Sequence, residues 1–207
     1  MLRRVALTGG IATGKSHVRE AFEKIGIPTI DADQLARMAL APGTPGIDTV
    51  VARFGSSVLG TDGALDRSRL ASIVFDDPSA RRDLERIVHP GVRLAIDRWF
   101  ASLPPDAWGI ADIPLVYETG RARQFDAVIV TTCSPATQLA RLAARPGVTA
   151  HDAERRIAAQ LPLEEKVRRA DHVIDTGGTF EETDRQVRAV LDRLRSASNG
   201  PSRGHRH

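Results

Sequence analysis

The sequence has few of the features that mark membrane, secreted or disulfide-bonded proteins. No apolar run approaches the roughly 20 residues that a membrane-spanning helix needs. The opening segment, MLRRVALTGG, runs directly into a glycine loop and has no apolar signal-peptide region. Cys133 is the only cysteine, so an internal disulfide is excluded. These absences predict a cytoplasmic protein without a membrane partner.

Basic and aromatic residues are not gathered in the way that nucleic-acid-binding proteins gather them. The formal net charge is only +3, and aromatic residues make up 4% of the chain. The basic residues are nearly all arginines interspersed with Glu and Asp, and the lysines are Lys15, Lys24 and Lys166. A nucleic-acid binder more often carries a dense basic block with interleaved aromatic residues. We therefore expect no nucleic acid partner.

What the sequence does contain is a series of short apolar segments separated by helical patterns. Five segments are typical of buried strands, and all but the second are largely continuous apolar runs, as in a sheet covered on both faces. They are residues 4–8, 27–31, 108–116, 126–133 and 171–176. Strands that alternate with helices predict an α/β fold with a parallel five-stranded sheet flanked by helices.

The spacing of these strands predicts how the chain is divided. The stretch between the second and third strands is too long for one crossover helix, so residues 34–106 are predicted to form a helical insertion. A shorter, Arg-rich excursion covers residues 135–170. The tail, 196–207, has no apolar periodicity and is expected to be disordered. The predicted core is then made of residues 1–33, 107–134 and 171–195.

One motif carries most of the functional information. Gly9, Gly14, Lys15 and Ser16 fit the Walker A pattern G-x-x-x-x-G-K-S, after an apolar strand and before a helical pattern. Glycines let successive backbone N–H groups point at phosphate oxygens, and the helix N-terminus adds its dipole. The residues expected to bind the phosphates of a nucleotide are Gly9, Gly10, Ala12, Thr13, Gly14, Lys15, Ser16 and His17. The alternative is a glycine-rich turn with a solvated lysine.

Two members of this loop have specific expected roles. Lys15 is expected to bridge the β- and γ-phosphates, and the Ser16 hydroxyl is expected to bind Mg²⁺. The Asn-Lys-x-Asp motif with which GTPases read guanine is absent, because Asn199 is the only asparagine. The motif of motor proteins is not clearly present either. These absences favour a kinase, which holds a second substrate in line with the γ-phosphate.

A pair of carboxylates follows the second strand, in the sequence IDADQLA. Asp31 and Asp33 are two residues apart and share a face for as long as the strand continues. The carboxyl ends of strands are where ligands bind in open α/β sheets. Asp33 is the candidate general base that accepts the proton of an attacking hydroxyl. The alternative is that Asp33 caps a helix beginning near Gln34.

An ordered set of motifs resembles the dephospho-CoA kinase family. TGGIATGKS, IDAD, HPGVR, IPLVYE, QLARLAAR, RRIAAQ and ADHVIDTGG follow one another from about residue 4 to residue 178. The resemblance implies ATP-dependent phosphorylation of the 3′-hydroxyl of dephospho-CoA, the last step of coenzyme A synthesis. It also implies a P-loop kinase built from a core, a helical substrate domain and a mobile lid at residues 135–170.

The resemblance implies roles for several residues outside the loop. His89 and Arg93, on a helix expected to begin near Pro90, are implied to lie near the substrate, as is Glu118, expected at the end of the third strand. The alternatives are a packed histidine and a solvated arginine. Asp112 is expected to be structural or an indirect partner of Mg²⁺.

Arginines of the predicted lid are expected to neutralise the transferred phosphoryl group. Arg141 is the favoured residue, followed by a weaker set comprising Arg145, Arg155, Arg156 and Gln160. The alternative is a helix with a solvated basic face. Asp33, Lys15 and Arg141 are thus the expected catalytic residues.

The chain also departs from the family pattern. Ala12 stands where the family usually has glycine, so its backbone must suit an L-residue. His17 replaces a hydroxyl residue, and Thr176 stands where the family commonly has Asn. If that last position contacts adenine, base selectivity is altered here.

Two other functions remain open at this stage. One is a kinase for another small alcohol, such as shikimate or a nucleoside monophosphate. The other is a nucleotide-gated binding protein whose insertion contacts a protein partner. The favoured interpretation is a monomer or weak homo-oligomer that uses ATP and Mg²⁺ and takes dephospho-CoA as substrate.

Overall fold

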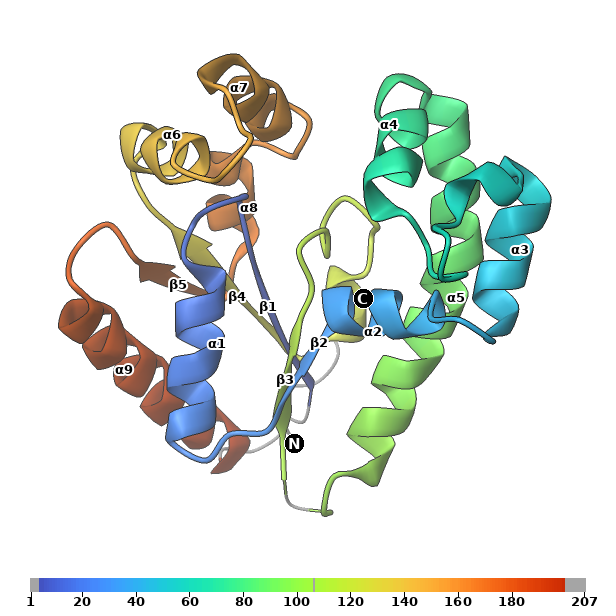
Figure 1. The fold of residues 1–207 in the computed structure, drawn as a ribbon. Coiled ribbons are helices and arrows are strands. Elements are labelled where there is room, and N and C mark those ends of the chain that lie inside the picture. Colours follow the sequence, from blue (N-terminus) through green and yellow to red (C-terminus); the bar gives the residue numbers. More distant parts are fainter. Residues whose placement is uncertain (1–3, 106, 200–207) are drawn as a thin grey trace. The chain divides into compact units, whose positions relative to one another are not determined.

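The computed structural model describes residues 4–105 and 107–199 and contains the predicted parallel sheet (Figure 1). The sheet has the order β2-β3-β1-β4-β5, and β1 pairs in parallel with β3 and β4, as does β4 with β5. Its strands are β1 (Arg4–Gly9), β2 (Thr29–Asp31), β3 (Gly109–Asp112), β4 (Ala127–Thr132) and β5 (His172–Asp175). The predicted α/β fold class is therefore confirmed.

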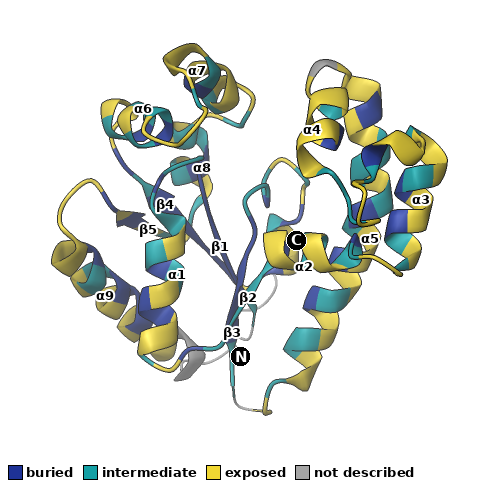
Figure 2. Ribbon diagram, viewed as in Figure 1, coloured by how far each residue is buried: buried dark blue, intermediate teal, exposed yellow. Residues whose placement is uncertain are grey.

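The apolar core forms where two helices cover one face of this sheet. Helix α1 (Lys15–Lys24) and helix α9 (Phe180–Asn199) pack against each other beside the strands (Figure 1). Their apolar stripes meet β1, β4 and β5 in a cluster that includes Val5, Leu7, Val18, Phe22, Ile129, Ile174, Val187 and Leu194. Figure 2 shows β1, β3 and β4 as largely buried and the outer faces of both helices as exposed. This packing fixes the end of β1, from which the phosphate loop leaves.

Contacts between residues divide the chain into two compact units. We call Met1–Ile30 together with Leu103–His207 the sheet unit, and Asp31–Ser102 the helical unit. The helical unit begins and ends within four residues of the predicted insertion, 34–106. Residues 135–170 belong to the sheet unit and form α6 (Pro135–Ala143), α7 (Ala150–Ala158) and α8 (Leu163–Arg169). Their movement as a lid stays a prediction.

The helical unit packs four helices around a small apolar core. They are α2 (Ala32–Ala39), α3 (Pro45–Phe54), α4 (Arg67–Asp76) and α5 (Pro78–Ser102), with a short 3₁₀ turn at Ser56–Val58. Helix α5 contacts the other three. Side-chain oxygens of Asp31, Thr44 and Asp66 accept bonds from backbone N–H groups and begin α2, α3 and α4.

The structure corrects the prediction that a helix begins near Pro90. Pro90 lies inside the continuous helix α5, although it has no N–H to donate to the carbonyl of Arg86. Val88, Val92 and Ile96, spaced four apart, form a buried stripe through this point. Burial of that stripe outweighs the missing hydrogen bond.

Two further segment boundaries differ from the prediction. Strand β3 was predicted to reach residue 116 but ends at Asp112, because Pro114 has no N–H to continue the ladder. Helix α9 continues to Asn199, so residues 196–199 of the predicted tail are helical, and residues 200–207 lie outside the described part. Within the described residues, no helix is both long and apolar enough to cross a membrane.

Candidate functional site

The phosphate loop is a tight turn between β1 and α1. Gly14 caps α1 in the left-handed region, with φ of 73°. The Gly10 carbonyl accepts from the Thr13 hydroxyl at 2.8 Å and from the Thr13 N–H at 3.3 Å. A Cβ at Gly9 would lie 2.2 Å from the Thr131 hydroxyl oxygen, so only glycine fits there. The loop amides are thus held in a curl at a helix N-terminus, an arrangement suited to anions.

Lys15, the phosphate-binding candidate, forms an ion pair with Asp112. Its ammonium donates to Asp112, a carboxylate at the end of β3 that is only 2% exposed. The Arg19 Nε lies 3.6 Å from the other oxygen of the same carboxylate. Asp112 therefore holds the lysine beside the loop, a role that the sequence did not predict for it.

Ser16 and His17 complete the loop at the start of α1. Ser16 is exposed. The ring Nε2 of His17 lies 2.9 Å from an oxygen of Asp184, and its ring centre lies 4.5 Å from that of Phe180. The His17 side chain is therefore directed to α9, while its backbone remains part of the helix N-terminus.

Arg141 and Thr176 lie together beside the loop. The Arg141 guanidinium donates to the Thr176 hydroxyl at 3.0 Å and to its carbonyl at 2.7 Å. The buried Thr176 hydroxyl in turn donates to the Thr13 carbonyl at 2.9 Å. Arg141, the favoured arginine of the predicted lid, is thus linked to the phosphate loop through a single residue, Thr176. They also give Thr176 a contact with the loop backbone.

Glu118 occupies a different place from the one predicted. It lies in turns after β3, and its Oε1 is 2.7 Å from the Lys166 ammonium. The same oxygen accepts from the Leu161 N–H at 3.2 Å. Lys166 is fully buried and also donates to the Gly9 carbonyl at 3.2 Å. A buried lysine needs such partners, so Glu118 and Lys166 together support the start of the loop.

Sequence reasoning missed Lys166 and Gln138. Gln138 donates to the Ile11 carbonyl at 2.8 Å, and Gln160, expected as a weaker phosphate ligand, accepts from the Ile11 N–H at 2.9 Å. The one available signal was the scarcity of lysine, since Lys166 is among only three. A single glutamine in a helix carries no comparable signal.

The remaining predicted arginines of the lid are exposed. Arg145 follows α6, and Arg155 and Arg156 lie in α7.

Cys133, just after β4, is buried, and this burial raises the pKa of its thiol. Burial also raises the pKa of Tyr117, in the turns before Glu118, to about 12. Both groups are neutral at physiological pH.

Apart from Glu118, the candidates for the acceptor site belong to the helical unit. Asp31 is the residue that caps α2, accepting from the N–H groups of Asp33 and Gln34 at 2.8 and 3.1 Å. Strand β2 ends at Asp31, so the two carboxylates do not share a strand face, and Asp33 lies exposed in the first helical turn. His89 is half-buried and Arg93 exposed, four residues apart on α5.

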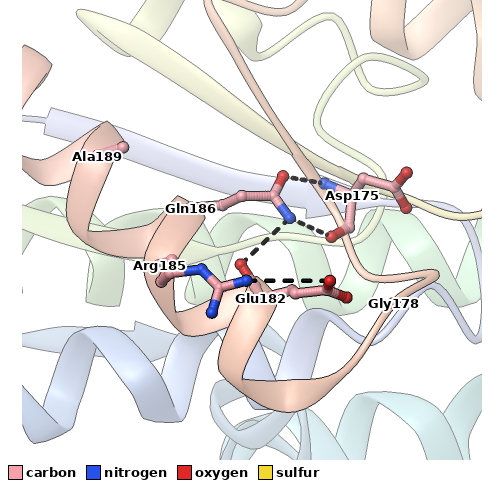
Figure 3. A pocket seen from close by; sticks show the side chains of 6 residues that line it. All are labelled: Asp175, Gly178, Glu182, Arg185, Gln186 and Ala189. Carbon is pink, nitrogen blue, oxygen red and sulfur yellow. Dashed lines mark hydrogen bonds and ion pairs between the residues drawn. The ribbon is translucent and has the colours of Figure 1, made fainter.

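A separate open hollow of about 510 Å³ lies between the end of β5 and α9 (Figure 3). The Gln186 amide accepts from the Asp175 N–H at 2.9 Å and donates to the Asp175 carbonyl at 2.7 Å. It therefore pairs with the outer edge of β5 as a neighbouring strand would. At this hollow, the Gln186 side chain of α9 covers part of the edge of the sheet.

Comparison with known proteins places these features in a family. A family model described as dephospho-CoA kinase matches residues 3–182. A dephospho-CoA kinase of Syntrophotalea carbinolica is 43% identical over 199 residues, covering 95% of this chain and 94% of that protein. One from Shouchella clausii is 45% identical over 190 residues, covering 91% and 96%.

A solved structure agrees with the sequence comparison. The dephospho-CoA kinase from Campylobacter jejuni superposes with a TM-score of 0.72 and 26% identity, covering 95% of this chain and 99% of that one. The matched residues include both the sheet unit and the helical unit, since they cover 95% of the chain.

Proposed function

Because the chain belongs to the dephospho-CoA kinase family, we propose that it transfers the γ-phosphoryl group of ATP to the ribose 3′-hydroxyl of dephospho-CoA. The observation that carries this proposal is the family match across residues 3–182, which includes an intact Walker A loop with Lys15 beside it. The chain is a kinase, and ATP is the phosphoryl donor that the family uses. The product is coenzyme A, in the final step of its synthesis.

The sheet unit supplies the phosphate site. We assign the triphosphate to the loop from Gly9 to His17, which leads into the N-terminus of α1 through the left-handed Gly14. Lys15 moves from Asp112 to the phosphates, or shares its protons with both, when ATP binds. Arg141 neutralises charge that develops on the transferred group, since a positioned arginine contributes about 10³ to 10⁵ in rate.

A Mg²⁺ ion fits the oxygen atoms at this site. The exposed Ser16 hydroxyl and the buried Asp112 carboxylate are hard oxygen donors, and Mg²⁺ commonly uses one or two protein oxygens together with phosphates and waters. Ser16 would hold the ion directly. When bound, Mg²⁺ neutralises charge on the β- and γ-phosphate oxygens.

The helical unit supplies the acceptor side. Asp33 is the proposed general base, because its carboxylate is exposed in the first turn of α2 while Asp31 takes over the capping role. His89 and Arg93 are proposed to bind dephospho-CoA. Glu118, in the sheet unit, is proposed to border the acceptor with its charge balanced by Lys166.

The remaining predictions concern motion, assembly and location. Residues 135–170 are proposed to close as a lid over ATP and exclude water. The protein is proposed to act as a monomer or weak homo-oligomer in the cytoplasm.

A substrate panel tests the proposed function. ADP release is measured with ATP, Mg²⁺ and one acceptor at a time: dephospho-CoA, shikimate or AMP. We expect turnover with dephospho-CoA to exceed the others by orders of magnitude, and mass spectrometry of the product to place the new phosphate on the ribose 3′-oxygen. Preference for shikimate or AMP would favour another small-molecule kinase. ATP binding without turnover on any acceptor would favour a nucleotide-gated binding protein.

A further inference from the structure

Ala12 has an unusual backbone conformation at the centre of the phosphate loop. Its φ is 61°, and no other non-glycine residue in the described ranges 4–105 and 107–199 has a positive φ. An L-residue there brings its Cβ close to backbone oxygen, which glycine avoids. Such a conformation persists only when the surrounding structure holds it in place.

The two peptide groups that precede Ala12 are both held by side chains. In the Gly10–Ile11 peptide, the carbonyl accepts from Thr13 at 2.8 Å and the N–H donates to Gln160 at 2.9 Å. In the Ile11–Ala12 peptide, the carbonyl accepts from Gln138 at 2.8 Å. A change in the φ of Ala12 rotates this second peptide group relative to the residue. The bond from Gln138 opposes that rotation.

Gln138 is packed directly against the loop. Gln138 is only 5% exposed. A Cβ added at Gly10 would lie 2.6 Å from the Gln138 Nε2. Loss of its bond would leave the Ile11 carbonyl without this donor. Gln138 lies near the start of segment 135–170 and Gln160 near its end, so both ends of that segment are tied to the loop.

We infer that Gln138 and Gln160 are positioning residues that keep Ala12 left-handed and thereby keep the phosphate loop in its ATP-binding shape. The inference rests on the proposed function in that ATP is the ligand of the loop. Without the Gln138 amide the Ile11–Ala12 peptide can rotate, and without the Gln160 amide the Gly10–Ile11 peptide before it can rotate. In either case Ala12 relaxes toward negative φ, and the N–H groups of the following residues change direction.

The test is a double-mutant cycle with Ala12→Gly. Gln138→Leu and Gln160→Leu are made in the natural chain and in an Ala12→Gly background, and the Kd for a non-hydrolysable ATP analogue is measured by calorimetry. In the natural chain each substitution is expected to raise the Kd by about threefold to tenfold, the effect of one hydrogen bond. In the Ala12→Gly background the increase is expected to be less than about twofold, because glycine adopts a positive φ without support.

Gln124→Leu is the matched control. The Gln124 amide accepts from Arg121 at 3.0 Å, outside the loop, so its loss should change the Kd by less than about twofold in both backgrounds. A kcat that changes less than KM for ATP is a second expected result, since a role in overall folding alone would not separate the two.

Two results would overturn the inference: an unchanged Kd for both glutamine variants, or equal increases in the two backgrounds. If Gln138→Leu fails to fold, the half-buried Gln160 decides the question alone. Binding is measured without an acceptor, so the outcome is separate from the substrate panel. A chain that binds the analogue but does not phosphorylate dephospho-CoA would refute the proposed function and leave this inference standing.

Discussion

The sheet unit and the helical unit differ in what they bury. All of the buried polar and charged residues found in the described part of the chain lie in the sheet unit, and they include Thr13, Asp112, Gln138, Lys166 and Thr176. The buried residues found in the helical unit are apolar. Buried polar groups with satisfied bonds fix a unique local geometry.

This difference suits two tasks. The bonds of the sheet unit converge on one loop, from Gly9 to Thr13, and hold its backbone in place. Preorganised donors are what a charged phosphate requires. The helical unit leaves Asp33 and Arg93 exposed on helices, as an acceptor-binding surface requires. Substitutions in the two units should therefore separate ATP binding from acceptor chemistry.

The largest combined effect on ATP binding and turnover is expected for Lys15→Ala. Removal of the ammonium should lower turnover by about 100-fold or more and weaken ATP binding, because the charge on the β- and γ-phosphates is left without its main side-chain partner. A coupled ADP-release assay measures the loss. Lys24→Ala, an exposed lysine at the other end of α1, is the control and should be close to the natural chain. Near-normal turnover of Lys15→Ala would contradict the proposal that this loop binds the phosphates of ATP.

A large effect on stability is expected for Lys166→Met. Loss of the buried ammonium leaves Glu118 and the Gly9 carbonyl without their shared donor. We expect about 3 kcal/mol less stability and a Tm lower by about 6 to 12 °C in a thermal scan. The double variant with Glu118→Gln should recover part of this loss, since the carboxylate charge is also gone. A Tm unaffected by Lys166→Met would show that the buried pair does not support the loop.

How much of this the sequence could predict depends on the distance along the chain between partners. The loop, the strands and the fold class follow from local patterns, which is why Gly9 to Ser16 could be assigned directly. The partners of the loop could not, because Gln138, Gln160 and Lys166 lie more than 100 residues from the backbone atoms they bind. No local pattern encodes such pairs.

Local rules also failed where two of them competed. Pro90 and the buried stripe of Val88, Val92 and Ile96 make opposite predictions for α5, and the stripe prevailed. Asp33 was the candidate cap of a helix beginning near Gln34, but α2 begins at Ala32, directly after β2, and Asp31 caps it. The choice in each case depended on packing that the sequence pattern does not show.

A moderate effect confined to the acceptor is expected for Arg93→Ala. If this exposed residue binds dephospho-CoA, its loss should raise the KM for dephospho-CoA by about tenfold, the effect of one charged hydrogen bond. The Kd for the ATP analogue should stay the same. Arg98→Ala, exposed on the same helix, is the matched control. Equal losses of affinity for ATP and for the acceptor would contradict the proposal that the sheet unit binds ATP and the helical unit binds the acceptor.

The smallest effect is a pH dependence of stability in the sheet unit. Burial lowers the pKa of His172, on β5, below its usual value of 6.5. The unfolded chain therefore binds this proton more readily, and stability falls as pH drops from above 6.5 through the folded pKa. His172→Gln should flatten the urea-unfolding profile between about pH 7.5 and 5.5 by less than about 1 kcal/mol. Identical profiles for both chains would show that His172 does not contribute.

We propose that the sheet unit binds ATP while Asp33 of the helical unit activates the acceptor. Asp33→Asn tests it most directly, with the Kd for the ATP analogue and the turnover of dephospho-CoA measured on one preparation. We expect an unchanged Kd and a turnover lower by about 10² to 10⁴, the contribution of a general base. Unchanged turnover, or a loss of ATP binding that matches the loss of turnover, would contradict it.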